Sequence, residues 1–96
     1  MKFVSLTPST RKDKRFMYEY LDDNDKRKKI HFGFKGGQTY LEHNDKEKRK
    51  NYISRHKAGN EDWNVISAGA LSRFILWGDS NDLQKNLKAF NAKFRM

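Results

Sequence analysis

Residues 67–78, "SAGALSRFILWG", are the least polar part of an otherwise charged chain. As a helix this stretch would be apolar on nearly every side, with only Ser72 and Arg73 interrupting, and a helix of that kind is buried. The alternative is an exposed surface kept for a partner. We favour the buried helix, because the other elements each carry one apolar face that needs an apolar neighbour.

The composition supports a small folded domain. The chain has 96 residues, of which 34% are charged and 35% hydrophobic, and 14% are aromatic. Aromatic side chains bury enough area to offset the entropy of ordering such a polar chain. We expect one domain (1–96) with a β-rich half (1–43) and a helical half (44–96). The predicted fold is α+β: a small antiparallel hairpin or three-stranded sheet followed by three helices, the middle one buried.

The β-rich half carries the period-two pattern of strands. The segment "RFMYEYL" (15–21) would line three aromatic rings along one face, and "KRKKIHFGFKGG" (26–37) would do the same with Ile30, Phe32 and Phe34. The polar turn "DDND" joins these two strands as an antiparallel hairpin. The N-terminal "KFVSL" is a candidate third strand, and "QTYLEH" (38–43) is expected to leave the sheet through a glycine-rich turn.

The helical half shows a different period. Asn44 is expected to cap a helix over residues 45–57, and Asp79 or Ser80 to cap a last helix over 83–96. That last helix has leucine and phenylalanine side chains at helical spacing, which predicts an apolar stripe facing the core. The buried stretch described above lies between these two helices in the sequence.

The charge indicates the class of partner. The formal net charge is +9 at pH 7, from 21 lysine and arginine and 12 aspartate and glutamate residues. Nucleic acid is the first polyanion to consider, an acidic protein surface the next and an anionic membrane the third. Two segments combine basic with aromatic residues, "KRKKIHFGFKGG" (26–37) and "KEKRKNYISRHK" (46–57). Their cations would contact phosphates, while aromatic rings stack on bases or sugars.

These two segments supply the predicted polyanion-binding residues. They are Lys26, Arg27, Lys28, Lys29, Lys35, Lys46, Lys48, Arg49, Lys50, Arg55 and Lys57. On the first predicted helix, Lys46, Lys50 and Lys57 would cluster on the side away from Tyr52. Tyr52 and Trp63 are candidate stacking residues or partner anchors. For Trp63, in the loop "NEDWN", a plug on the core is the favoured alternative.

Several classes of site have no support in the sequence. The chain has no cysteine, and the spacing of His31, His43 and His56 matches no metal motif. No catalytic motif is present, so we expect no metal, no cofactor and no enzymatic activity. No apolar run approaches the roughly 20 residues of a membrane span, and the start lacks the apolar stretch of a signal peptide.

A set of segments along the chain points to a family. They are "STRKDKRFM", "HFG", "YLEHNDKEKRKNYISRHK", "EDW", "AGALSRFILW" and the closing "AKFRM". Their order resembles a family of small basic proteins encoded by large nucleocytoplasmic DNA viruses of the phycodnavirus and mimivirus kind. The turn "LDDNDKRKK" is longer than in that family, and the proline expected before the core helix is absent.

The resemblance implies a setting rather than an activity. The family has no assigned biochemical function and supplies no catalytic residues. It implies a viral protein packaged in the virion, and present in the host cytoplasm or nucleus during assembly.

Two functions remain open from the sequence. The first is binding of nucleic acid, DNA above all, or of another polyanion, without sequence specificity. The alternative is a minor capsid or structural protein that docks on acidic capsid proteins. A single basic face would favour the first, and basic residues on several faces would favour the second.

Overall fold

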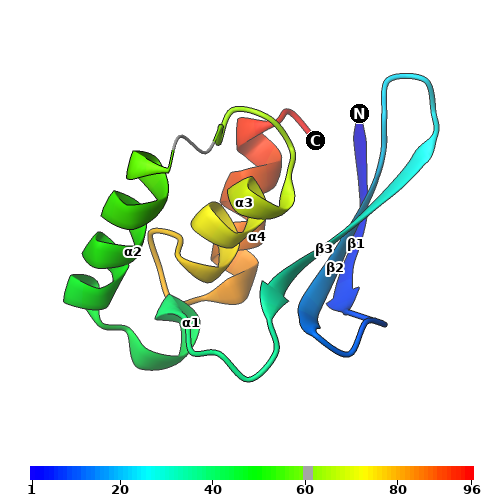
Figure 1. The fold of residues 1–96 in the computed structure, drawn as a ribbon. Helices are drawn as coiled ribbons and strands as arrows, with labels where there is room; N and C mark the ends of the chain where they lie inside the picture. The colour runs from blue at the N-terminus through cyan, green and yellow to red at the C-terminus, as the bar shows by residue number, and fades with distance from the viewer. Residues whose placement is uncertain (60–61) are drawn as a thin grey trace.

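The computed structural model describes residues 1–59 and 62–96; Asn60 and Glu61, in the predicted loop before Trp63, lie outside the described residues. The N-terminal part forms a three-stranded antiparallel sheet in the order β1-β2-β3 (Figure 1). The strands are β1 (Lys2–Pro8), β2 (Lys14–Leu21) and β3 (Arg27–Phe34). The predicted hairpin is β2–β3, and the candidate third strand is β1.

Aromatic residues line the face of the sheet that meets the helices. Phe16 pairs with Phe32, and Tyr18 with Ile30, across β2 and β3. Directly paired residues point to the same face of a sheet, so the two predicted rows come together. Tyr18 and Phe32 are buried, and Phe16 and Ile30 pack against the same core. The period-two prediction is confirmed over this part of the sheet.

The prediction is wrong at the end of β3, where Phe34 is 72% exposed instead of facing the core. Gly33 has a φ of +80°, a left-handed conformation that interrupts the regular alternation of side chains. The chain then turns over residues 34–37: the Gly37 N–H donates to the Phe34 carbonyl (3.1 Å), and Gly36 has a φ of +93°. A positive φ at the third residue is typical of a type II turn, which holds Phe34 at the surface.

Helices follow the sheet. They are α1 (Tyr40–His43), α2 (Lys46–Ala58), α3 (Ala68–Leu71), the π-helical segment η1 (Ser72–Leu76) and α4 (Leu83–Lys93). The α+β class is confirmed, and the described residues hold four α-helices where three were predicted. The additional helix is α1, and the predicted middle helix corresponds to α3, which continues into η1.

The segment "QTYLEH", for which the sequence predicted no helix, contains α1. Thr39 caps this helix and its backbone N–H donates to the Glu42 carboxylate (3.2 Å), which completes a capping box. Asn44, with a φ of 49°, ends α1 instead of beginning α2. Asp45 caps α2 in its place, accepting from the Glu47 N–H (3.0 Å). A helix of one turn is too short to show a period, so the sequence pattern missed it.

The apolar stretch is buried, as predicted. Leu71, Ile75 and Leu76 are each at most 2% exposed. The α3 helix packs against β3, and η1 packs against both β3 and α4. The Trp77 N–H donates to the carbonyl of Ser72, five residues earlier (3.0 Å), which widens this last turn. Figure 1 shows α3 between the sheet on one side and α2 on the other.

The apolar stripe of α4 is confirmed. Leu87 and Phe90 are buried against the core. The cap of α4 is Asp82, whose carboxylate accepts a backbone N–H of the first turn at 3.0 Å. The sequence prediction of Asp79 or Ser80 as the cap is therefore wrong, because Asp82 stands directly before the first helical residue.

Candidate functional site

The α2 helix carries more of the predicted binding residues than any other element of the fold. Its inward side presents Arg49, Tyr52, Ile53 and His56, which are half-buried as the helical period predicts. Tyr52 stacks on Trp77, with 4.4 Å between ring centroids and 6° between ring planes. This predicted stacking residue is thus engaged within the fold, where it helps to join α2 to the end of η1.

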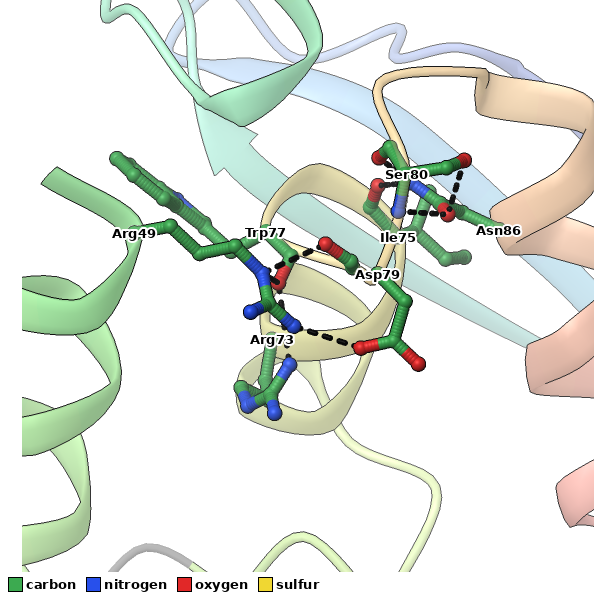
Figure 2. A network of polar contacts seen from close by, with 8 residues as sticks. Arg49, Arg73, Ile75, Trp77, Asp79, Ser80 and Asn86 are labelled. Carbon is green, nitrogen blue, oxygen red and sulfur yellow. Dashed lines mark hydrogen bonds and ion pairs between the residues drawn. The ribbon is translucent and has the colours of Figure 1, made fainter. Parts of the chain in front are cut away.

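Arg49 differs from the other cations of α2. Its Nε donates to the carbonyls of Gly78 (2.7 Å) and Trp77 (3.3 Å), and its Nη2 pairs with Asp79 (2.7 Å) (Figure 2). These contacts satisfy carbonyls at the end of a helix, where cations are favoured. Arg49 was predicted to contact phosphate, but the structure places its guanidinium in this internal network.

Arg73 joins the same network from η1. Its Nη1 donates to the Trp77 carbonyl (3.0 Å), and its guanidinium carbon lies 5.3 Å from the ring centroid of Trp63. Burial lowers the pKa of Arg73, and the charge of Arg49 adds to that shift. Trp63 is half-buried, with its ring 6.3 Å from that of Phe74, and it packs against the core. This is the position expected of a plug.

The remaining cations of α2 face solvent. They are Lys46, Lys48, Lys50, Arg55 and Lys57, and all five are exposed. Within residues 1–59 and 62–96, none of them forms an ion pair with a carboxylate. The helix as a whole carries six basic residues and one acidic residue, a formal charge of +5 with histidine neutral. The five exposed cations thus form a positive surface without an ion-paired carboxylate in the described part of the chain.

Two cations of the β2–β3 hairpin lie beside carboxylates. Arg27 pairs with Glu19 (3.2 Å) and Lys28 lies 4.0 Å from Asp22. The pKa of Asp22 is lowered first by a hydrogen bond from the backbone N–H of Lys26 and then by one from Asn24. The positive charges of Lys28 and Lys26 lower it further. Four basic residues (26–29) thus share their turn with three aspartates, Asp22, Asp23 and Asp25.

The two basic groups lie at opposite ends of the molecule. Figure 1 shows the β2–β3 turn at the far end of the sheet, whereas α2 lies beyond the core helices. The eleven predicted residues therefore do not form one continuous face. Lys35 stands apart from both groups, at the corner of the turn over residues 34–37, and it is exposed.

A groove runs between α2 and the segment that leaves β3. Its volume is about 440 Å³, and its walls are formed by Gly33, Phe34, Gly37, Gln38, Thr39, Tyr52, Arg55, His56, Ser72, Leu76 and Trp77. A second hollow of about 610 Å³ shares Gln38, Arg55 and Trp77 with it and adds Lys48, Asn51 and Ser54. Apolar walls with a few polar groups are typical of ligand sites.

Sequence reasoning found only part of this groove. Tyr52 and Arg55 were predicted as binding residues, as was Lys48 at the second hollow, but Phe34 and the apolar stretch that contains Trp77 were assigned to the core. The available signal was the Gly36-Gly37 pair, which marks a turn just after an aromatic residue.

The described residues show neither a cluster of metal ligands nor a membrane-spanning helix. In the part of the chain that the structure describes, no three histidine, aspartate or glutamate side chains gather where they could hold a metal ion. Among the same residues, no helix has the length and apolar character needed to cross a membrane.

Comparison with known proteins places the chain in a family. A family model described as a family of unknown function (DUF5754) matches residues 4–56, which is more than half of the chain. The protein belongs to this family. The matched residues include the sheet, α1 and most of α2. Searches among curated proteins and among solved structures gave no match.

Proposed function

We propose that this protein binds nucleic acid without sequence preference, as a binding protein rather than an enzyme, through the exposed cations of α2. One observation carries the proposal: five exposed basic side chains on this helix have no carboxylate partner among the described residues. Cations of this kind gain from contact with phosphates, because binding releases the counterions condensed on the nucleic acid. Cations already paired with carboxylates gain less.

The distribution of charge favours α2 over the hairpin. The β2–β3 turn holds nearly as many carboxylates as cations, so an approaching polyanion would meet both signs there. The α2 helix holds one acidic residue against six basic ones. The virion of a large DNA virus, which the sequence resemblance implies, is the setting in which we expect this binding.

A second candidate function is docking on an acidic protein, such as a capsid protein. The observation that favours it is the position of basic residues at both ends of the molecule (Figure 1). A protein wedged between acidic neighbours would use cations on more than one side. In that case the hairpin and α2 would contribute alike.

Salt-dependent binding distinguishes the two functions. Fluorescence anisotropy would be measured on a random-sequence duplex and a single strand of about 20 nucleotides, from about 50 to 400 mM salt. If about six phosphates are contacted, the logarithm of affinity for duplex should fall with the logarithm of salt at a slope of roughly −5. No binding to either nucleic acid even at about 50 mM salt, where phosphate contacts are strongest, would favour an acidic protein partner instead.

A matched pair of variants locates the surface. The first replaces Lys46, Lys48 and Lys50 with glutamine; the second replaces Lys26, Lys28 and Lys29. Both remove three exposed lysines and the same formal charge. The α2 variant should weaken binding and reduce the salt slope by about 2 to 3, since each phosphate contact contributes about 0.9. The hairpin variant should change little. Equal effects would contradict the assignment to α2.

A further inference from the structure

We infer that the groove between α2 and the segment after β3 receives an unpaired base, so that single-stranded nucleic acid is the preferred ligand. The inference rests on the proposed function and names its ligand class. Its first support is Phe34, a large aromatic side chain that is 72% exposed at the wall of the groove. An exposed ring is a stacking surface for any base, because every base has a π-face.

The position of Phe34 is fixed by the backbone around it. The Gly37 N–H donates to the Phe34 carbonyl (3.1 Å), and the Lys35 N–H donates to the Asp13 carbonyl (3.2 Å). The following capping box at Thr39 anchors the other end of the segment. A backbone held in this way does not have to be ordered on binding, and pre-organisation of this kind favours affinity.

The groove matches a base in size and chemistry. Its volume of about 440 Å³ lies within the range of small-ligand sites, which is roughly 300 to 1,000 Å³. Leu76 and Trp77 provide apolar wall, while Gln38 and Ser72 provide hydrogen-bonding groups. A base needs this combination, since its faces are apolar and its edges are polar.

Cations suited to the adjoining phosphates lie at the same groove. Arg55 borders both hollows and Lys48 borders the second one, and both are exposed without a carboxylate partner among the described residues. Lys35 stands at the corner of the turn next to Phe34. A strand with one base against Phe34 would therefore meet positive charge on both sides of that base.

Duplex nucleic acid lacks access to such a groove. Its bases are stacked and paired, so their faces reach a protein ring only after unpairing, which costs free energy. Both forms would be attracted by the cations of α2, but only a single strand offers an unpaired base to Phe34. The preference for single strands should therefore depend on this ring.

The experiment compares three probes of equal length: a thymidine strand, an abasic strand with the same phosphates, and a duplex. The wild-type protein should bind the thymidine strand most tightly. Phe34→Ala should weaken binding to the thymidine strand by roughly tenfold, which is the lower part of the range for loss of one stacked base. The affinity of this variant for the abasic strand and for the duplex should stay within about twofold of the wild type. Phe34→Tyr should retain the preference. Because Phe34 is exposed, thermal unfolding should confirm that Phe34→Ala stays folded.

Charge variants test which side of α2 contacts the single strand. Lys48→Gln with Arg55→Gln removes the cations at the groove, while Lys50→Gln with Lys57→Gln removes two from the other flank of the helix. The first pair should weaken single-strand binding more than the second.

Equal losses of single-strand affinity in the two double variants would overturn the inference, as would a Phe34→Ala variant that binds the thymidine strand as tightly as the wild type. Either result would leave nucleic-acid binding by α2 intact. If the protein bound poly-glutamate as tightly as the nucleic-acid probes, or bound none of these probes, both proposals would be overturned.

Discussion

Asn86 forms the most complete set of polar contacts in the core. Its side chain is 4% exposed, and its Nδ2 donates to the carbonyls of Ile75 (2.8 Å) and Ser80 (2.7 Å) (Figure 2). Its Oδ1 accepts from the Ser80 hydroxyl (3.0 Å) and the Ser80 N–H (3.3 Å). Both amide donors and both acceptor positions are thus used, which ties α4 to the last turn of η1.

Removal of this amide should be costly. Asn86→Ala leaves the Ile75 carbonyl without its partner inside the core, and an unsatisfied buried group together with the lost contacts costs about 2 to 4 kcal/mol. Urea unfolding should therefore show a lower midpoint with an unchanged slope. Asn81→Ala, at an exposed position in the same loop, should stay within about 0.5 kcal/mol of the wild type. Similar midpoints for the two variants would contradict a structural role for Asn86.

The backbone of Gly78 also packs tightly between the end of η1 and α4. A methyl group added there would overlap the Phe74 carbonyl oxygen and lie 2.7 Å from Cγ of Asn86. The close approach of α4 to the end of η1 thus depends on a residue without a side chain. In the sequence this glycine is visible only as the end of the apolar stretch.

At the scale of the element, α1 depends on contacts outside itself. A helix of four residues is too short to be stable alone. Glu42 holds it in place, because its carboxylate accepts from the Thr39 hydroxyl (3.0 Å) and from Nη1 of Arg15 on β2 (2.5 Å). The pKa of Glu42 is lower than usual: partial burial raises it, but the hydrogen bonds and the charge of Arg15 outweigh that effect.

This shift predicts how stability depends on pH. Because the pKa of Glu42 is lower in the folded chain, the unfolded chain takes up the proton first as the pH falls. The contribution of Glu42 is complete above the ordinary value of 4.5 and is lost as the pH falls through the lower folded value. Glu42→Gln should therefore be less stable than the wild type at pH 7 and approach it in acid, as measured by urea unfolding.

A control separates this contact from general charge effects. Glu47 is exposed, and its side chain accepts no hydrogen bond from the residues that the structure describes. Glu47→Gln should change the pH dependence less than Glu42→Gln does. A constant difference between wild type and Glu42→Gln from pH 7 into acid would contradict the role of the ionised carboxylate.

The elements also show what the sequence can predict. Strands β2 and β3 and helix α4 were recognised because each repeats its apolar positions over two or more periods. Helix α2, whose large apolar side chains are the adjacent Tyr52 and Ile53, was recognised from the capping residues at its start. The caps were misplaced by one to three residues, since Asn44 and Asp45 both suit a helix start and only the packing of α1 selects between them. The exposure of Phe34 depends on one backbone angle at Gly33, which a side-chain pattern does not encode.

The candidate site was less predictable than the fold for a related reason. The cations of α2 could be assigned to one helix from their spacing. The groove, however, combines side chains from β3, α2 and η1, which lie far apart in the sequence. Likewise, the ion pair between Arg27 and Glu19 appears only when β3 is paired with β2, because the two residues lie diagonally across the two strands.

At the scale of the whole molecule, a single aromatic cluster joins the sheet to the helices. The ring of Tyr18 contacts those of Phe3 (5.4 Å between centroids) and Phe90 (5.3 Å), and its hydroxyl donates to Oδ1 of Asn91 (2.6 Å). Burial raises the pKa of Tyr18, so this hydroxyl stays protonated as a donor. The sheet and α4 are thus connected through the side chain at the centre of β2.

The apolar stretch completes this core, so one charge placed in it should unfold the whole molecule. Ile75 is 0% exposed. Ile75→Asp would bury a carboxylate without a partner, at a cost of several kcal/mol, comparable to the roughly 5 to 15 kcal/mol that stabilises a typical domain. Near-ultraviolet circular dichroism should lose its native signal. Ile75→Val removes one methylene, costs about 0.5 to 1.5 kcal/mol and should keep that signal. A folded Ile75→Asp variant would mean that α3 and η1 form a surface for a partner instead of the core.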